Sequence, residues 1–349
     1  MRSWLYAVLV ILSIILLGAS AFRPTVSDSE YSLHPDTPVA EVLERLGDPP
    51  LPHKPNFKLR GVSVVRGYDI VHYGTTTGPD GQRTTKQSPH FVCTSCHNMV
   101  REDPDLSVAD PEARLDYCAA QGIPFLPGTT MYGVVNRTSF YNGDYEKKYG
   151  DLVYRARYDL REAIQLCAIA CSQGRHLAPW ELESVLAYFW TLQLKMGDLQ
   201  LTPHEWQEVE GALAQGRPSG ATIELIKSHY LQASPATFVP PPDDRRQGYA
   251  VPPGNPQRGR LIYQQSCLHC HWDKRFSFFA LDYDLRTFSF LSKHIARYTR
   301  YSIYQVIRWG TEPIPGKRAY MPNFTLEKMS HQQVEDLRAF IETQAHSEQ

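Results

Sequence analysis

Two five-residue segments constrain this chain more than any other feature of its sequence. "CTSCH" spans residues 93–97, here called the first motif, and "CLHCH" spans residues 267–271, the second motif. A Cys-x-x-Cys pair is common as half of a zinc site, as a redox dithiol, or as the attachment point of a c-type haem when histidine follows at once. Histidine follows directly in both motifs, which predicts two covalently bound haems.

The other two uses of the motif fit less well. A zinc site needs four nitrogen or sulfur ligands, and a redox dithiol has no need of the adjacent histidine. In a c-type site both thiols bond to the haem vinyl groups, and the next residue presents its imidazole to the iron. We therefore expect haem attachment at four cysteines, Cys93, Cys96, Cys267 and Cys270, and iron ligation by two histidines, His97 and His271.

The N-terminus has the pattern of a secretory signal peptide. Arg2 precedes an apolar run over residues 4–17, and Ala19-Ser20-Ala21 forms an A-x-A cleavage site. The apolar run is shorter than the ~20 residues of a spanning helix, although an uncleaved membrane anchor is the alternative. Export to the periplasm agrees with covalent haem attachment, which takes place outside the cytoplasm.

Length and charge narrow the class of protein further. The chain has 349 residues and a formal net charge of −1, so it suggests about two domains and no nucleic-acid partner. Alternation typical of strands is scarce, and the expected fold is all-α, with two cytochrome c-like haem domains joined by a Pro-rich linker.

The expected organisation follows composition along the chain. Residues 1–21 form the signal peptide and 22–60 an irregular segment with one helix in "PVAEVLERLG" that stops at Gly47. Residues 61–198 form the first haem domain. Residues 199–253 hold two short bracing helices, the first capped by Thr202 and Pro203, and the Pro-rich linker. Residues 254–349 form the second haem domain.

The second domain resembles a class I cytochrome c. A helix leads into the second motif, and a last helix starts at Ser330 with a capping box to Gln333. Its apolar face is formed by Val334, Leu337, Phe340 and Ile341. The resemblance implies that the two helices cross, with Gly259 permitting close approach and Tyr263 packing near Phe340.

The same resemblance implies that Met321 is the sixth iron ligand opposite His271. It lies in "KRAYMPNF", just before the last helix, and a thioether ligand favours reduced iron. The alternatives are that Met321 is a core residue or that His294 ligates the iron. Met329 is expected at the surface near the helix cap, and His269 is expected to be exposed to solvent.

The first domain leaves its sixth ligand open. Leu160, Ile164, Cys167 and Cys171 follow one helical face, Gly174 ends the helix and Pro179 opens another. This block, with "TSFYNGDY", resembles the haem domain of thiosulfate dehydrogenase and the SoxA cytochromes. The resemblance implies a Cys167 thiolate as axial ligand. The chain departs from that family at Ala170 and Cys171, where the family has Arg and Ser.

Other ligands for the first haem remain possible interpretations of the same residues. Met131 follows Gly128 in a loop, a normal place for an axial methionine. A histidine ligand and an open iron are further alternatives, and a buried Cys167 is also consistent with inert packing. Cys118, Cys167 and Cys171 are an odd number of spare thiols: a Cys118–Cys171 disulfide would leave Cys167 over, or all three are free.

Two functions follow from these expectations. The first is an electron carrier that relays electrons between redox protein partners through two haems. The second is an enzyme that oxidises a small sulfur anion such as thiosulfate at the first haem, with Cys167 at the catalytic iron. Convergence of Arg137, Arg155 and Arg161 on that haem would favour the enzyme. A dihaem peroxidase would need an open iron with acid–base residues beside it, and nothing in the sequence marks them.

Overall fold

The fold is described here from a computed structural model that covers residues 32–311 and 320–347. Within these ranges the regular elements are helices and helical turns, with only isolated β-bridges between loops, so the all-α prediction is confirmed. No helix in the same ranges is long and apolar enough to cross a membrane. The expected signal peptide, residues 1–21, lies outside the described residues.

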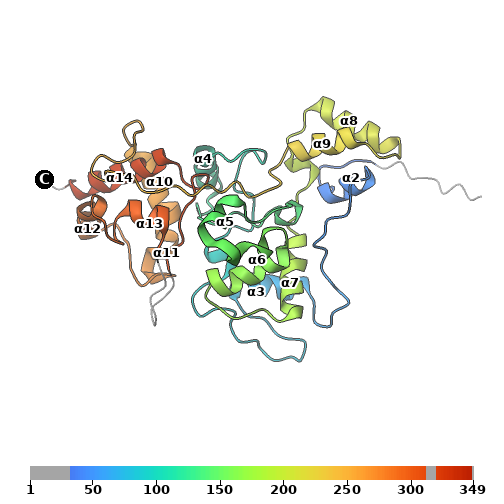
Figure 1. Ribbon diagram of the computed structural model, residues 1–349, viewed down its shortest axis with the longest axis horizontal. Coiled ribbons are helices and arrows are strands. Elements are labelled where there is room, and N and C mark those ends of the chain that lie inside the picture. The colour runs from blue at the N-terminus through green and yellow to red at the C-terminus, as the bar shows by residue number, and fades with distance from the viewer. Residues whose placement is uncertain (1–31, 312–319, 348–349) are drawn as a thin grey trace, which may run out of the picture.

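The helices form three groups that follow one another across the molecule (Figure 1). The outer group holds α2 (Val39–Arg45), α8 (Pro203–Ala214) and α9 (Gly220–Ser228). The central group holds α3 (Val64–Tyr73), α5 (Gly143–Tyr149), α6 (Leu160–Leu166) and α7 (Pro179–Trp190). The C-terminal group holds α10 (Pro256–Ile262), α11 (Leu268–His271), α12 (Leu285–Ile295), α13 (Ile303–Trp309) and α14 (His331–Ala345).

Two crossing helices organise the C-terminal group as the sequence predicts. A side chain on Gly259 of α10 would clash with the backbone of Asp336 in α14, so glycine permits the close crossing. Tyr263 packs against Phe340, with ring centroids 5.5 Å apart. The predicted capping box between Ser330 and Gln333 starts α14.

The central group repeats this arrangement. Helix α3 packs along α7, and a side chain on Gly67 of α3 would clash with the backbone of Ser184 in α7. Each Cys-x-x-Cys-His motif therefore follows a helix that crosses a later helix at a glycine. The sequence did not indicate the α3–α7 crossing, because the 19 residues 74–92 separate the end of α3 from the first motif.

The outer group combines helices from before and after the central group in the sequence: α2 precedes α3, and α8 and α9 follow α7. Helix α2 forms where it was predicted, with Gly47 at a φ of +97° just beyond it. Thr202 caps α8, and Pro203 is its first residue. The apolar faces of α2, α8 and α9 share one cluster of buried side chains. The described part of the N-terminal segment, residues 32–60, is thus tied to the bracing helices through α2.

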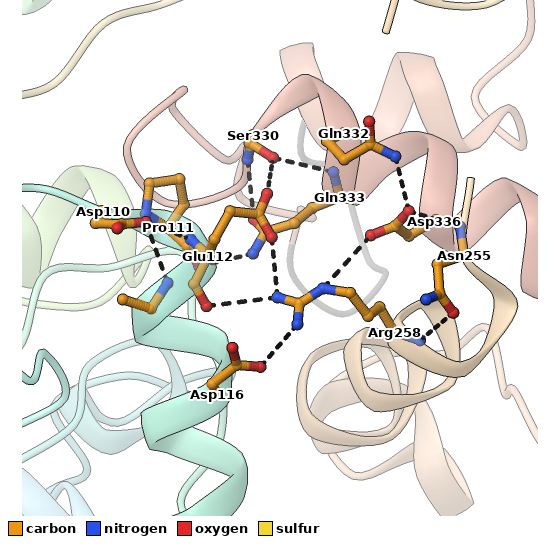
Figure 2. A network of polar contacts seen from close by, with 11 residues as sticks. Asp110, Pro111, Glu112, Asp116, Asn255, Arg258, Ser330, Gln332, Gln333 and Asp336 are labelled. Carbon is orange, nitrogen blue, oxygen red and sulfur yellow. Dashed lines mark hydrogen bonds and ion pairs between the residues drawn. The ribbon is translucent and has the colours of Figure 1, made fainter. Parts of the chain in front are cut away.

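Helix α4 (Pro111–Gln121) lies between the central and C-terminal groups (Figure 1) and packs into the C-terminal one. Leu115, Cys118 and Phe125 share a buried cluster with α10, α12, α13 and α14. Figure 2 shows the polar side of this contact, where Arg258 of α10 pairs with Glu112 and Asp116 of α4, each at 2.9 Å. A segment assigned to the first domain from its sequence position therefore completes the core around the second motif.

A buried charge cluster also joins the two groups. Glu102, with no exposed surface, lies 2.8 Å from the Lys328 ammonium and 3.3 Å from the Arg114 guanidinium. Burial alone would raise the pKa of Glu102, but the two cations outweigh burial and lower it. Arg114 also donates to the Lys328 carbonyl at 3.1 Å. The carboxylate is thus held between residues more than 200 positions apart.

The Pro-rich tract over 238–253 contains no helix, as expected, but it packs on the C-terminal group. Arg245 is buried and donates to the Arg297 carbonyl and to Gln305, both at 2.9 Å. Tyr249 stacks on His331, with centroids 3.9 Å apart. The tract is therefore held along its length by the helices it leads into.

We expect Lys328→Met to destabilise the fold by about 3–5 kcal/mol, the usual cost of removing one partner from a buried ion pair. The remaining Glu102 would lose its closest cation at a site with no exposed surface. Guanidinium unfolding followed by far-UV circular dichroism measures the loss.

The matched control for Lys328→Met is Lys195→Met, which removes an ion pair with Asp36 that is open to solvent. Exposed pairs contribute about 0–1 kcal/mol. Equal effects of the two substitutions would contradict a structural role for the buried cluster.

Candidate haem sites

The second motif lies at the end of a continuous helical stretch. Helix α10 passes into a π-helical turn over Tyr263–Cys267, and α11 carries Cys270 and His271. The His271 Nδ1 lies 2.7 Å from the Phe279 carbonyl oxygen. A carbonyl only accepts, so Nδ1 carries the proton and Nε2 keeps its lone pair for a metal. Burial lowers the pKa of His271 and favours the same neutral form.

An apolar cavity of about 690 Å³ opens beside this motif. Its size lies within the range of about 300–1,000 Å³ of ligand pockets. Cys267, Cys270, His271 and Met321 all line it, with apolar walls from Phe279, Leu291, Val306, Ile307 and Phe324. The predicted attachment and ligand residues of the second haem thus line one apolar cavity.

The backbone at Met321 is fixed in place by residues 310 and 311. Thr311 donates its amide to the Met321 carbonyl at 3.0 Å, and the Met321 amide donates to Thr311 Oγ1 at 2.8 Å. Gly310 has a φ of +69°, and a side chain there would meet the Met321 carbonyl. Two hydrogen bonds and one close approach therefore position the predicted thioether ligand.

The other residues weighed for the second haem are placed differently from Met321. His294 packs against Phe290 on α12 with the two rings tilted and their centroids 4.2 Å apart, and it does not line the cavity. Met329 was expected at the surface, but it is buried and lines the cavity, because its segment is held by Arg308 donating to its carbonyl at 2.8 Å.

The first motif shows the same histidine geometry. His97 Nδ1 lies 2.6 Å from the Thr129 carbonyl oxygen, so Nε2 is free for iron. A Cβ on Gly128 would lie 2.6 Å from the His97 ring, so this position has room only for glycine. Burial lowers the pKa of His97, which favours the neutral imidazole. The donor set and its support fit a c-type haem as at the second motif.

Met131 and Cys167, the leading candidates for the sixth ligand of the first haem, lie in different places. The Met131 amide donates at 2.8 Å to the carbonyl of Asn98, the residue after His97, and Met131 lies two residues from Thr129. Its backbone is therefore held on the His97 side. Cys167 begins a π-helical turn after α6, and its sulfur has Cys93 and Cys96 among its electrostatic neighbours.

The spare cysteines do not form the expected disulfide. None of the seven cysteines is in a disulfide, and Cys118 is buried on α4, where its sulfur donates to the Glu102 carbonyl at 3.8 Å. Cys171 lies beside Cys167 at the other end of the π-helical turn. The Cys118–Cys171 prediction is wrong because α4 packs into the C-terminal group, away from the turn.

The two motifs touch each other. The Cys270 sulfur lies 4.0 Å from the Ser95 carbonyl oxygen, and Cys96 lines the cavity of the second motif. His269 contacts the backbone of Thr94 and Ser95, so it is half-buried and not exposed as expected. Burial lowers its pKa to about 4. The loop between each pair of cysteines thus packs on the other motif.

The three arginines considered for a sulfur-anion site do not gather on the first motif. Arg161 pairs with Glu183 at 2.6 Å, and the exposed Arg155 pairs with Glu162 at 3.0 Å. Arg137 lines a small cavity of about 50 Å³ with Thr129, on the His97 side. Burial lowers the pKa of Arg137.

No family model, curated protein or solved structure matches the chain. Among the residues that the structure describes, no three or more His, Cys, Asp or Glu side chains are arranged as a metal-ion site.

Several supporting groups were not identified from the sequence. The carbonyls of Thr129 and Phe279 and the glycine at 128 orient the histidines, and Tyr320 reaches the first motif's surroundings from the C-terminal group. Only the Pro127-Gly128 pair, which marks a turn, gave a signal. Backbone carbonyls carry no sequence signature, so the others had none.

We expect Gly128→Ala to displace His97 and weaken its bond to the first iron. A Cβ at 2.6 Å from the ring forces the loop or the imidazole to shift. The visible and EPR spectra of the oxidised protein should show part of one haem converted from low to high spin.

Gly143→Ala is the matched control, because nothing lies within 4 Å of a Cβ there. Normal low-spin spectra for both variants would show that the loop at residue 128 does not support His97.

We expect Met321→Leu to remove the near-infrared band that arises from methionine bound to ferric haem, and to lower the potential of the second haem. Leucine keeps the volume but has no sulfur, and volume-conserving exchanges usually cost under about 1.5 kcal/mol. Met329→Leu makes the same exchange on the same cavity wall and should keep the band. Loss of the band only in Met329→Leu would reverse the ligand assignment.

Proposed function

We propose that the protein is an exported dihaem cytochrome c that relays electrons between redox partners in the periplasm. When bound, each haem supplies a one-electron Fe(III)/Fe(II) couple. The chain's own contribution is to fix two such groups close together, to set their ligands and to limit their contact with water.

The contact between the two motifs is the observation that supports this proposal. The Cys270 sulfur is 4.0 Å from the Ser95 carbonyl oxygen, and Cys96 lines the same cavity as Cys267 and Cys270. Groups attached through these three cysteines would be held with their attached edges in the same region. Electron tunnelling weakens steeply with distance, so such an arrangement favours transfer from one centre to the other.

Each motif belongs, on this proposal, to a cytochrome c-like haem domain. Gly67 and Gly259 mark the same kind of helix crossing, one before each motif. The histidine of each motif donates to a backbone carbonyl, from Thr129 or from Phe279. Two independent copies of one arrangement support two haem centres better than either copy alone.

The second centre is proposed to use His271 and Met321, and the first to use His97 and Cys167. The Met131 backbone is tied to Asn98, the residue after His97, so Met131 lies on the same side as that ligand residue. Cys167 comes instead from the turn after α6 and approaches Cys93 and Cys96. A thiolate at one iron and a thioether at the other would separate the two potentials, since axial ligand identity sets them.

A second candidate function is oxidation of a sulfur anion such as thiosulfate at the first centre. Cys167 beside the first motif favours it. Against it, Arg155 and Arg161 are bound to carboxylates, and Ala170 and Cys171 stand where the resembled family has Arg and Ser. The relay therefore remains the preferred function.

We expect the mature protein to carry two haem masses by mass spectrometry. The Cys93→Ala/Cys96→Ala variant and the Cys267→Ala/Cys270→Ala variant should each carry one. Ascorbate, a one-electron donor, should reduce the oxidised protein, and thiosulfate should leave it oxidised. One haem in the wild type would overturn the proposal, whereas reduction by thiosulfate would favour the second candidate.

A further inference from the structure

The outer surface of α12 carries positive charge that the chain around it does not neutralise. Residues 285–311 contain five lysines and arginines and no Asp or Glu. Arg286, Phe290 and Lys293 follow one helical face of α12, and Arg297 continues that face just beyond its end. All four side chains are exposed, and they are called the basic stripe below. None of its three cations forms an ion pair within the described part of the chain.

The opposite face of α12 explains why the helix forms, without help from the basic stripe. Phe288, Leu291 and Ile295 are buried in the cluster that α12 shares with α10, α13 and α14. Asp284 caps the helix by accepting from the Arg286 amide at 2.7 Å. Arg286 itself lies in the first turn, where the helix dipole disfavours a cation. The stripe therefore adds charge at a position where stability alone would not favour it.

Phe290 connects the basic stripe to the second motif. Its ring, 37% exposed, lies 5.9 Å from the Phe279 ring between centroids, and the Phe279 ring lies 6.0 Å from the His271 ring. Phe279 also supplies the carbonyl that orients His271. Two aromatic contacts thus separate the surface of α12 from the imidazole expected to bind the second iron, and electron tunnelling favours such a short route.

We propose that the basic stripe is the docking site for an electron-transfer protein whose own contact face is rich in carboxylates. This proposal rests on the proposed function and assigns one of the two redox partners to the second centre. Opposite charges steer such encounters and fix their orientation, and the exposed Phe290 ring supplies an apolar contact among them. One electron then passes between the partner's redox group and the second iron, so that one is oxidised as the other is reduced.

The place of α12 in the molecule suits a relay. It lies at the end of the C-terminal group that is remote from the central group (Figure 1). A protein bound to the basic stripe would therefore leave the central group, which holds the first motif, accessible to a different partner.

An anionic membrane surface is the competing partner for a basic face with exposed aromatic residues. The basic stripe has one apolar side chain among three cations, and α12 is 11 residues long. That face offers little apolar area for insertion between lipids, whereas a protein partner needs only matching charge and one central contact. The stripe therefore fits an acidic protein better than a lipid surface.

The test uses the full holoprotein and an acidic plant-type [2Fe–2S] ferredoxin as the probe. In stopped-flow experiments at low ionic strength, reduced ferredoxin should reduce the wild-type haems rapidly, and added salt should slow the reaction. The Arg286→Glu/Lys293→Glu/Arg297→Glu variant should react at least about tenfold more slowly, since charge steering changes association rates by about 10- to 1,000-fold. Calorimetry with oxidised ferredoxin should show a complex with the wild type that this variant does not form.

Lys58→Glu/Arg60→Glu/Lys86→Glu is the matched control. It makes the same change in net charge at three exposed cations near α3, which also lack ion pairs among the described residues. It should keep most of the wild-type rate and affinity. An equal loss in the control would show that net charge alone matters, and it would overturn the docking site.

The remaining outcomes separate this proposal from the proposed function. Two haem masses in the wild type, together with an unchanged ferredoxin reaction in the stripe variant or no complex with the wild type, overturn the docking site alone. Sedimentation of the wild type, but not of the stripe variant, with phosphatidylglycerol vesicles and an unchanged ferredoxin reaction would assign the stripe to a membrane instead. A single haem in the wild type would overturn the proposed function itself.

Discussion

A buried carboxylate between two cations fixes how the central and C-terminal helix groups dock against each other. Glu102 follows the first motif by five residues, Arg114 lies on α4, and Lys328 directly precedes the segment that starts α14. Because all three side chains are buried, their charges are compensated only when the central and C-terminal groups are docked in one way. The contact between the two motifs, and with it the proposed relay, depends on that docking.

The same packing arrangement, a close helix crossing at a glycine, is found next to both motifs. At Gly67 and Gly259 the missing side chain lets a helix backbone approach a later helix closely. That later helix closes the core behind the motif, while a carbonyl from a separate loop orients the histidine. What differs between the two halves is the ligand side, where Met321 approaches one motif and the turn at Cys167 approaches the other.

Sequence reasoning predicted the local features of this fold and missed its long-range ones. The helix class, the caps at Thr202 and Ser330 and the crossing at Gly259 were predictable, because they depend on residues close in sequence or on a familiar pattern. Helix α4 was not assigned to the C-terminal core, since its apolar face does not reveal its partner. His269 and Met329 were placed at the surface because their neighbours in space come from distant segments. The ligand roles of His97, His271, Met321 and Cys167 stay predictions.

The position of α4 has a consequence for how the protein is made. The chain is synthesised from its N-terminus, and early segments usually fold before later ones. Leu115, Cys118 and Phe125 find their apolar partners in residues 262–341, which arrive last. The loop that orients His97 follows α4 directly, so the first centre stays incomplete until the C-terminal helices have emerged. On the proposed function, maturation of the first centre is therefore coupled to synthesis of the second, and a chain that ended between α4 and α10 would leave the apolar face of α4 uncovered.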